Sequence, residues 1–154
     1  MNEAKRGITI ISYPDEILIH PNDESVSGIW FGAAISISLK KGIDDDTFCK
    51  SIISMFDKSK INIPHPDPKD WSSLSKLFLT KIGKKSKRKY MENAKLIQIK
   101  QYSDRFEIVP TKNGGIKGDN RGFSPISKKT ISVGTDRVDT SFIKYVYQAL
   151  DSCI

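Results

Sequence analysis

Residues 96–109 read Leu96-Ile97-Gln98-Ile99-Lys100-Gln101-Tyr102-Ser103-Asp104-Arg105-Phe106-Glu107-Ile108-Val109. Apolar and polar residues alternate on both sides of the turn residues Ser103 and Asp104. Alternation with a period of two is typical of strands that bury one face, and a short polar turn between two such runs indicates a hairpin. This stretch therefore predicts two antiparallel neighbouring strands.

The rest of the chain supplies further strands and several helices. β-branched or alternating residues predict strands at 7–11, 35–39 and 130–133. Apolar residues at helical spacing predict helices at about 45–58, 71–82 and 86–94, with Asp44, Asp70 and Ser86 as candidate N-caps, and a terminal helix that starts at Asp139 or Thr140 and runs to about residue 153. Runs of strands rather than strict alternation favour an α+β fold: a single domain over residues 1–154, with a mainly antiparallel sheet and about four helices.

Three segments are predicted to be irregular. Residues 20–25 read as a polar loop, residues 61–69 as a stiff connector with three prolines, and residues 110–115 as a glycine-rich loop. Each predicted helix is expected to bury its apolar stripe. In the second helix that stripe consists of Trp71, Leu74, Leu77 or Phe78, and Ile82.

Size and composition favour one hydrophobic core and no membrane-spanning segment. With 154 residues and 38% hydrophobic content, the chain is long enough for one core and too short for two comfortable ones. No apolar run approaches the roughly 20 residues of a membrane span. Glu3 interrupts the start of the chain, which lacks the apolar stretch of a signal peptide. We expect a cytoplasmic protein with no membrane partner, whose Cys49 and Cys153 stay reduced.

The net charge of +7 is unevenly distributed. Residues 1–80 contain 9 Lys or Arg and 11 Asp or Glu, whereas residues 81–154 contain 16 and 7. The second half would therefore attract an acidic partner or a phosphate backbone.

The sequence offers little for catalysis or for a metal. His20 and His65 both adjoin proline in predicted loops, so an RNase-like histidine pair is a weak hypothesis. His65 and Asp67 lack the further ligands that a zinc site requires. The segment from Asn113 to Gly118 lacks the Gly-Lys-Ser/Thr end of a phosphate-binding loop. We expect no enzyme activity, no metal and no cofactor.

A basic run raises the alternative of nucleic-acid binding. Six of the nine residues from Lys81 to Lys89 are Lys or Arg, and Tyr90 follows as a candidate stacking residue. No RNA-recognition, KH or zinc-finger pattern accompanies the run. A solvated helix face is the favoured interpretation, and a small basic RNA-binding protein that uses Lys81 to Lys89 is the alternative.

The uncharged residues around this run resemble a known family. They are Gly83, Ser86, Tyr90, Met91, Ala94, the segment Pro110-Thr111-Lys112-Asn113-Gly114-Gly115, and Gly122-Phe123-x-Pro125. This pattern is similar to that of the CdiI-type immunity proteins of bacterial contact-dependent growth inhibition systems. The resemblance implies a non-enzymatic protein that binds and neutralises the toxic C-terminal domain of a cognate CdiA effector, often an RNase.

Specificity for one toxin is expected in polar residues outside the shared pattern. Two sets are candidates. The preferred set is acidic and would mimic phosphate in a nuclease cleft: Asp15, Glu16, Asp23, Glu24, Asp44, Asp45 and Asp46. The second set lies on the glycine-rich loop and next to the basic run, and would meet an acidic toxin surface: Lys112, Lys117, Asp119, Asn120 and Arg121, with Lys84, Lys85, Lys87 and Arg88.

Overall fold

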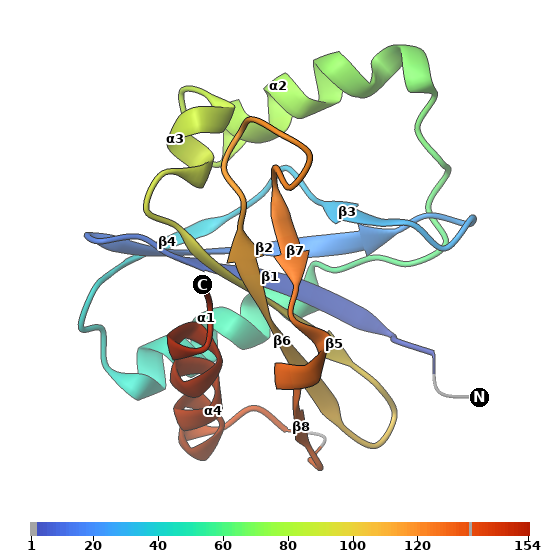
Figure 1. The fold of residues 1–154 in the computed structure, drawn as a ribbon. Coiled ribbons are helices and arrows are strands. Elements are labelled where there is room, and N and C mark those ends of the chain that lie inside the picture. Colours follow the sequence, from blue (N-terminus) through green and yellow to red (C-terminus); the bar gives the residue numbers. More distant parts are fainter. Residues whose placement is uncertain (1–2, 136) are drawn as a thin grey trace.

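A computed structural model describes residues 3–135 and 137–154 (Figure 1). An antiparallel sheet forms its centre, with strands in the order β3-β2-β1-β5-β6-β7; β4 also pairs with β2, and β8 with β6. The strands are β1 (Arg6–Ser12), β2 (Glu16–Glu24), β3 (Trp30–Gly32), β4 (Ile37–Lys40), β5 (Lys95–Gln101), β6 (Phe106–Asn113), β7 (Phe123–Pro125) and β8 (Ile131–Val133). The predicted hairpin is confirmed as β5 and β6, with Ile97 opposite Pro110.

The described residues form four α-helices on the two faces of this sheet. They are α1 (Asp45–Asp57), α2 (Trp71–Lys81), α3 (Lys87–Met91) and α4 (Thr140–Asp151). In Figure 1, α1 and α4 lie below the sheet, and α2 and α3 lie above it. The predicted α+β fold with a mainly antiparallel sheet and four helices is therefore confirmed.

The main core lies between the sheet and the pair α1 and α4. Because side chains alternate along a strand, Ile8 and Ile10 of β1 point into this core. They meet the helix residues Phe48 and Phe142, and all four side chains are essentially inaccessible to solvent. Burial of this apolar area is the main source of stability for the domain.

The opposite face of the sheet has a smaller core. Ile11 and Leu18 of the sheet pack there with Ile82, Ala94 and Leu96. Half-buried aromatic rings border the cluster: Phe78 from the end of α2, Tyr90 from α3 and Phe123 from β7. Only the C-terminal end of α2 takes part, so most of this helix lies outside both cores.

The predicted polar loop at 20–25 is wrong, because β2 continues to Glu24. Pro21 lies within the strand, opposite Ile8. Its carbonyl accepts from the backbone N–H of Ala33, so its missing N–H faces the outer edge of β2. At that edge the partner of β2 changes from β4, whose last pair is Ile19 with Ile37, to β3. Proline therefore costs no ladder hydrogen bond here.

The predicted loop at 110–115 is wrong in part for the same reason. β6 runs through Pro110 to Asn113, and the loop begins at Gly114. The Pro110 carbonyl accepts from the backbone N–H of Ile126. At this point the outer partner of β6 changes from β8 to β7. On each side of the sheet, the strand next to the edge thus has a proline at the point where its two short partner strands meet.

The helix starts agree well with the sequence. Asp44 accepts from the backbone N–H of Thr47, and Ser86 and Asp139 make equivalent bonds at the starts of α3 and α4. Asp70 makes no such bond; a 3₁₀ turn at Pro68–Asp70 precedes α2, and Asp67 caps that turn.

Candidate protein-binding surface

The basic run from Lys81 to Lys89 forms the turn after α2 and most of α3. Gly83 has a φ of 78°, which lets the chain turn after α2. Lys84 points inward: its Nζ lies 2.7 Å from Oε1 of Glu16 and 3.8 Å from the ring centre of Tyr13. Its side chain is only 15% exposed, so Lys84 has a structural role. The other cations of the run remain on the surface.

The loop at 114–122 is fixed beside α3. Asn113 donates through its side chain to the carbonyls of Met91 and Ala94, at 2.6 and 3.0 Å. The rings of Tyr90 and Phe123 lie 6.0 Å apart at 84°, which joins β7 to α3. In Figure 1 the loop rises next to α3. The structure therefore places the loop cations of the second candidate set beside those of α3, whereas Lys84 points inward.

Glycine is required at the base of this loop. A Cβ at Gly114 would lie 1.5 Å from the backbone oxygen of Asn120, so only glycine fits. Beyond that point Lys117, Asp119, Asn120 and Arg121 are all exposed. Lys112 is exposed too, but it lies on β6 and not on the loop.

The structure does not bring the acidic set together. Asp15 and Glu16 lie where β2 begins, and Asp23 and Glu24 lie where it ends. A strand rises about 3.3 Å per residue, so these pairs are roughly 26 Å apart. Glu16 is bound to Lys84 and Ser38, and Asp23 accepts from the backbone N–H of Lys60.

Asp44, Asp45 and Asp46 form a third location, at the start of α1. This helix covers the face of the sheet opposite to α2 and α3. Asp44 caps the helix through Thr47, which keeps the pKa of its carboxyl below the usual value. Asp46 pairs with Lys50 at 3.0 Å. The triplet thus has the local helix-start role that its position indicates.

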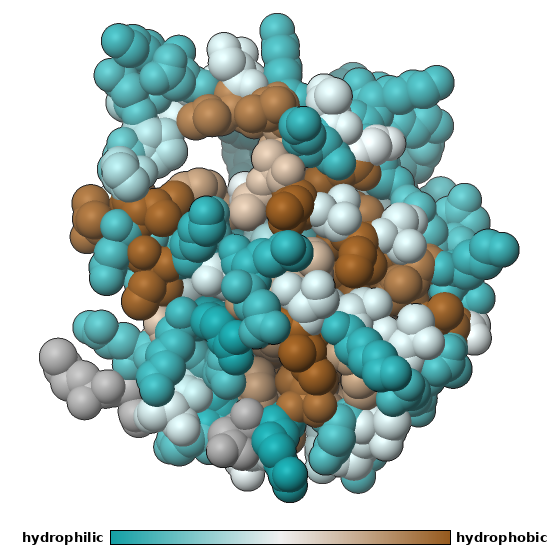
Figure 2. Space-filling model, turned by 180° about the vertical axis from the view of Figure 1, so that it is seen from behind, coloured by the Kyte–Doolittle hydropathy of each residue, from teal (hydrophilic) through white to brown (hydrophobic). Residues whose placement is uncertain are grey.

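The apolar stripe of α2 is not buried as predicted. Trp71, Leu74 and Leu77 are 55%, 42% and 46% exposed, and only Phe78 and Leu79 of α2, with Ile82 just after it, are shielded from solvent. Figure 2 shows brown apolar surface on the upper part of the molecule, where α2 lies. An exposed tryptophan with neighbouring leucines is typical of a surface that binds another protein.

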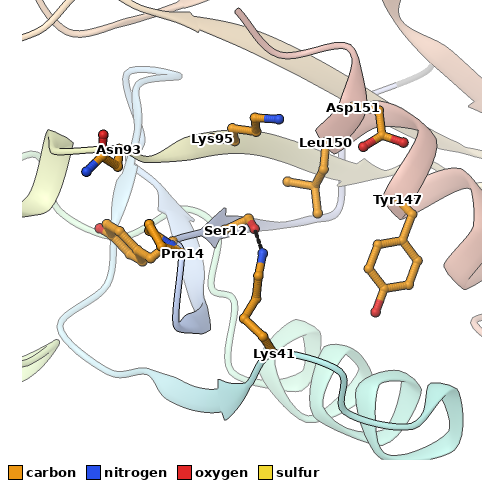
Figure 3. A pocket seen from close by; sticks show the side chains of 9 residues that line it. Ser12, Pro14, Lys41, Asn93, Lys95, Tyr147, Leu150 and Asp151 are labelled. Atoms are coloured by element: carbon orange, nitrogen blue, oxygen red, sulfur yellow. Dashed lines mark hydrogen bonds between the residues drawn. The ribbon is translucent and has the colours of Figure 1, made fainter.

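A separate hollow lies where β1 ends and β5 begins, beside α4 (Figure 3). Its lining includes Ser12, Lys41, Lys95, Tyr147 and Asp151. Lys41 donates to the Ser12 hydroxyl at 2.6 Å. This bond ties the turn after β4 to the end of β1.

The two histidines do not form a catalytic pair. His20 is buried on β2, so its prediction as a solvated loop residue is wrong. Burial lowers its pKa to about 4. His65 lies on the connector and contacts Ser27 at 3.1 Å. Within the described residues, no group of three or more His, Cys, Asp or Glu side chains is placed to hold a metal ion.

Comparisons with known proteins find similarity in structure but not in sequence. The sequence matches no protein-family model and no curated protein. Its structure is similar over the full length of both chains to a protein of unknown function from Neisseria meningitidis, with a TM-score of 0.78 and 12% identity. It is also similar to a chain of the CdiA-CT/CdiI toxin and immunity complex from Yersinia pseudotuberculosis, again over both full lengths, with a TM-score of 0.73 and 13% identity. The fold is therefore one found in a toxin–immunity complex.

Sequence reasoning missed the surroundings of His20 and the exposure of α2. One signal for the first was present: Ile17, Leu18 and Ile19 lead directly into His20, and an apolar run of this kind indicates a buried strand. For α2, the signal is weaker: three serines, Ser72, Ser73 and Ser75, lie among the apolar residues of its first half.

In the described part of the chain, no helix is long and apolar enough to cross a bilayer.

Proposed function

We propose that this chain is a non-enzymatic immunity protein that binds and neutralises the toxic C-terminal domain of a cognate CdiA effector. The observation that carries the proposal is the full-length similarity of its fold to a chain of a CdiA-CT/CdiI complex. The exposed apolar face of α2 supports a protein partner, because the rest of the described chain leaves Trp71, Leu74 and Leu77 uncovered.

The partner surface on this chain combines α2 with the cations beside it. Trp71, Leu74 and Leu77 supply the apolar centre that a stable interface needs. In Figure 1, α3 and the loop lie on the same side of the sheet as α2, and both segments carry exposed cations, including Arg88, Lys117 and Arg121. We call α2, α3 and residues 114–122 together the α2 surface.

The charges of the α2 surface define the chemistry of its partner. A basic rim steers and orients an acidic partner surface. A nuclease, the toxin class that the resemblance implies, must keep its substrate cleft basic. The α2 surface would then meet the toxin outside that cleft and block access to the substrate. This arrangement favours the basic candidate set over the dispersed acidic one.

Co-expression tests the proposal. The toxin domain encoded next to this chain is expressed with and without it, and growth and co-purification are scored. The proposal expects rescued growth and a complex that stays intact at moderate salt. If the toxin still kills and no complex forms, the proposed function is wrong. Binding to RNA with an affinity that falls steeply with salt would instead support the RNA-binding alternative.

A further inference from the structure

A cavity of about 290 Å³ lies between the sheet and the end of α2. Five aromatic side chains line it: Trp30, Phe31, Phe78, Tyr90 and Phe123. Its polar lining comes from Thr9, His20, Asn22 and Gln98. The size lies at the lower limit for small-molecule pockets and fits a single ring system.

One polar atom in this cavity has no partner. His20 is 3% exposed, and its Nδ1 lies 3.1 Å from the carbonyl oxygen of Pro21. A carbonyl can only accept, so Nδ1 carries the proton and Nε2 presents a lone pair. Nε2 is buried without a hydrogen-bond partner. Buried polar atoms are nearly always paired, so an unpaired one points to a missing donor.

The ring of Phe78 packs against this imidazole. The two meet edge-on, with 5.0 Å between centroids, and both rings border Gly32. A phenyl ring fills the space but cannot donate a hydrogen bond. Phe78 also belongs to a loosely held helix, since none of the 11 residues of α2 is buried.

We propose that this pocket receives an aromatic group with an O–H or N–H donor, a phenol or an indole, which displaces Phe78 and donates to Nε2 of His20. The pocket lining contains no carboxylate, and Lys100 already lies 5.4 Å from the ring centre of Trp30. A cationic group is thus disfavoured, and a neutral aromatic donor fits. If the proposed function holds, the group is a Tyr or Trp side chain of the toxin, inserted beside the α2 surface.

The free chain tests the pocket without the toxin. Binding of p-cresol, a phenol, is measured by NMR and compared with binding of p-xylene, which has the same shape but no donor. His20→Phe keeps a ring and removes the acceptor, and Phe78→Ala removes the present occupant. Ser75→Ala, on the exposed part of α2, is the matched control.

The proposal expects p-cresol to shift the resonances of Trp30 and Phe31 and the ¹⁵N resonance of His20 Nε2. Its affinity should fall about three- to tenfold in His20→Phe, the usual effect of one lost hydrogen bond. The affinity of p-xylene should not fall. Phe78→Ala should bind p-cresol more tightly than wild type, and Ser75→Ala should match wild type.

The contrary results are equally specific. The pocket proposal is wrong if p-cresol leaves the Nε2 resonance of His20 unchanged in both wild type and Phe78→Ala, even when His20→Phe does not fold. With the toxin domain present, displacement of p-cresol identifies the toxin as the source of the aromatic group. Toxin binding without displacement would leave the proposed function standing and overturn the toxin side chain as occupant.

Discussion

The ring of Phe78 meets the imidazole of His20 at 84°, edge to face, across the gap between α2 and the sheet. This contact joins the helix with the exposed apolar face to the one buried histidine of the sheet. Gly32 makes it possible, because a Cβ at that position would lie 2.7 Å from Cε1 of Phe78 and 3.0 Å from Cε1 of His20.

Stability should depend on pH through His20. Burial lowers its pKa from the ordinary 6.5 to about 4. Between these values the unfolded state binds the proton and the folded state does not, so the free energy of unfolding falls as the pH falls from 6.5 to 4. The slope from this one group is about 1.4 kcal/mol per pH unit.

Urea unfolding of wild type and His20→Phe at several pH values measures this effect. As the pH is lowered, the free energy of unfolding should fall for wild type but not for His20→Phe through this group, so the variant should gain stability relative to wild type. His65→Phe, at an exposed histidine, is the control and should keep the wild-type slope. Parallel curves for wild type and His20→Phe would contradict the prediction.

Gly32→Ala should destabilise the protein by pushing on Phe78. Overpacking of this kind costs about 1–3 kcal/mol. In a Phe78→Ala background most of the clash is gone, so the same substitution should cost less than about 1 kcal/mol. A double-mutant cycle by urea unfolding gives the coupling free energy between the two substitutions. Strictly additive effects on the free energy of unfolding would show that a Cβ at position 32 does not clash with Phe78.

The Glu16–Lys84 pair should stabilise the fold. The bonds from Lys84 and Ser38 hold the pKa of Glu16 below its usual value. This contribution is present above the ordinary carboxyl pKa and is lost as the pH falls through the lower folded value. Glu16→Gln should cost about 1–3 kcal/mol at pH 7.

A neighbouring ion pair provides the comparison. Lys89 and Glu92 lie 3.0 Å apart, but their side chains are 60% and 49% exposed. Exposed pairs contribute at most about 1 kcal/mol, so Glu92→Gln should have a small effect in the same unfolding experiment. If Glu16→Gln and Glu92→Gln lowered the free energy of unfolding equally, the buried Glu16–Lys84 pair would stabilise the fold no more than the exposed pair does.

Toxin binding should depend on α2 and not on α1. Trp71→Ala should weaken the complex about tenfold or more, as for an aromatic interface anchor, with little change in stability because the side chain is largely exposed. The combined variant Asp45→Asn, Asp46→Asn tests the acidic set and should bind like wild type. Calorimetry with the toxin domain measures both; the opposite outcome would place the toxin at α1.

The cations of the loop should act mainly on the rate of association. Lys117→Glu with Arg121→Glu should slow toxin association and reduce its dependence on ionic strength, since charged rims steer encounter. Dissociation should change less. Stopped-flow association at several salt concentrations checks this, and an unchanged rate would exclude the loop from the encounter surface.

Local signals predicted much of this fold. The alternation around Ser103 and the cap at Asp44 depend on neighbouring residues alone, and both were confirmed. Pro21 and Pro110 were misread because their effect depends on which strand lies beside them, which local sequence does not contain. The spacing of Trp71, Leu74 and Leu77 gave the helix face correctly but could not show whether anything covers it.

The candidate site was predictable only in part. The sequence grouped Lys117 and Arg121 with the run before Tyr90, and the structure brings these segments together. It grouped Glu16 with Glu24, which lie at opposite ends of one strand. The single-domain extent of 1–154 and the toxin contacts of both sets remain predictions.

Pro21 and Pro110, each on the strand next to a sheet edge, bear on self-association. Each edge consists of two strands of three or four residues, β4 and β3 on one side and β8 and β7 on the other, divided at Pro21 and Pro110. A second copy would find no long, flat row of free backbone groups on which to add a strand. The chain exposes an apolar helix that other copies could contact, but its short edge strands disfavour the strand addition by which fibres grow.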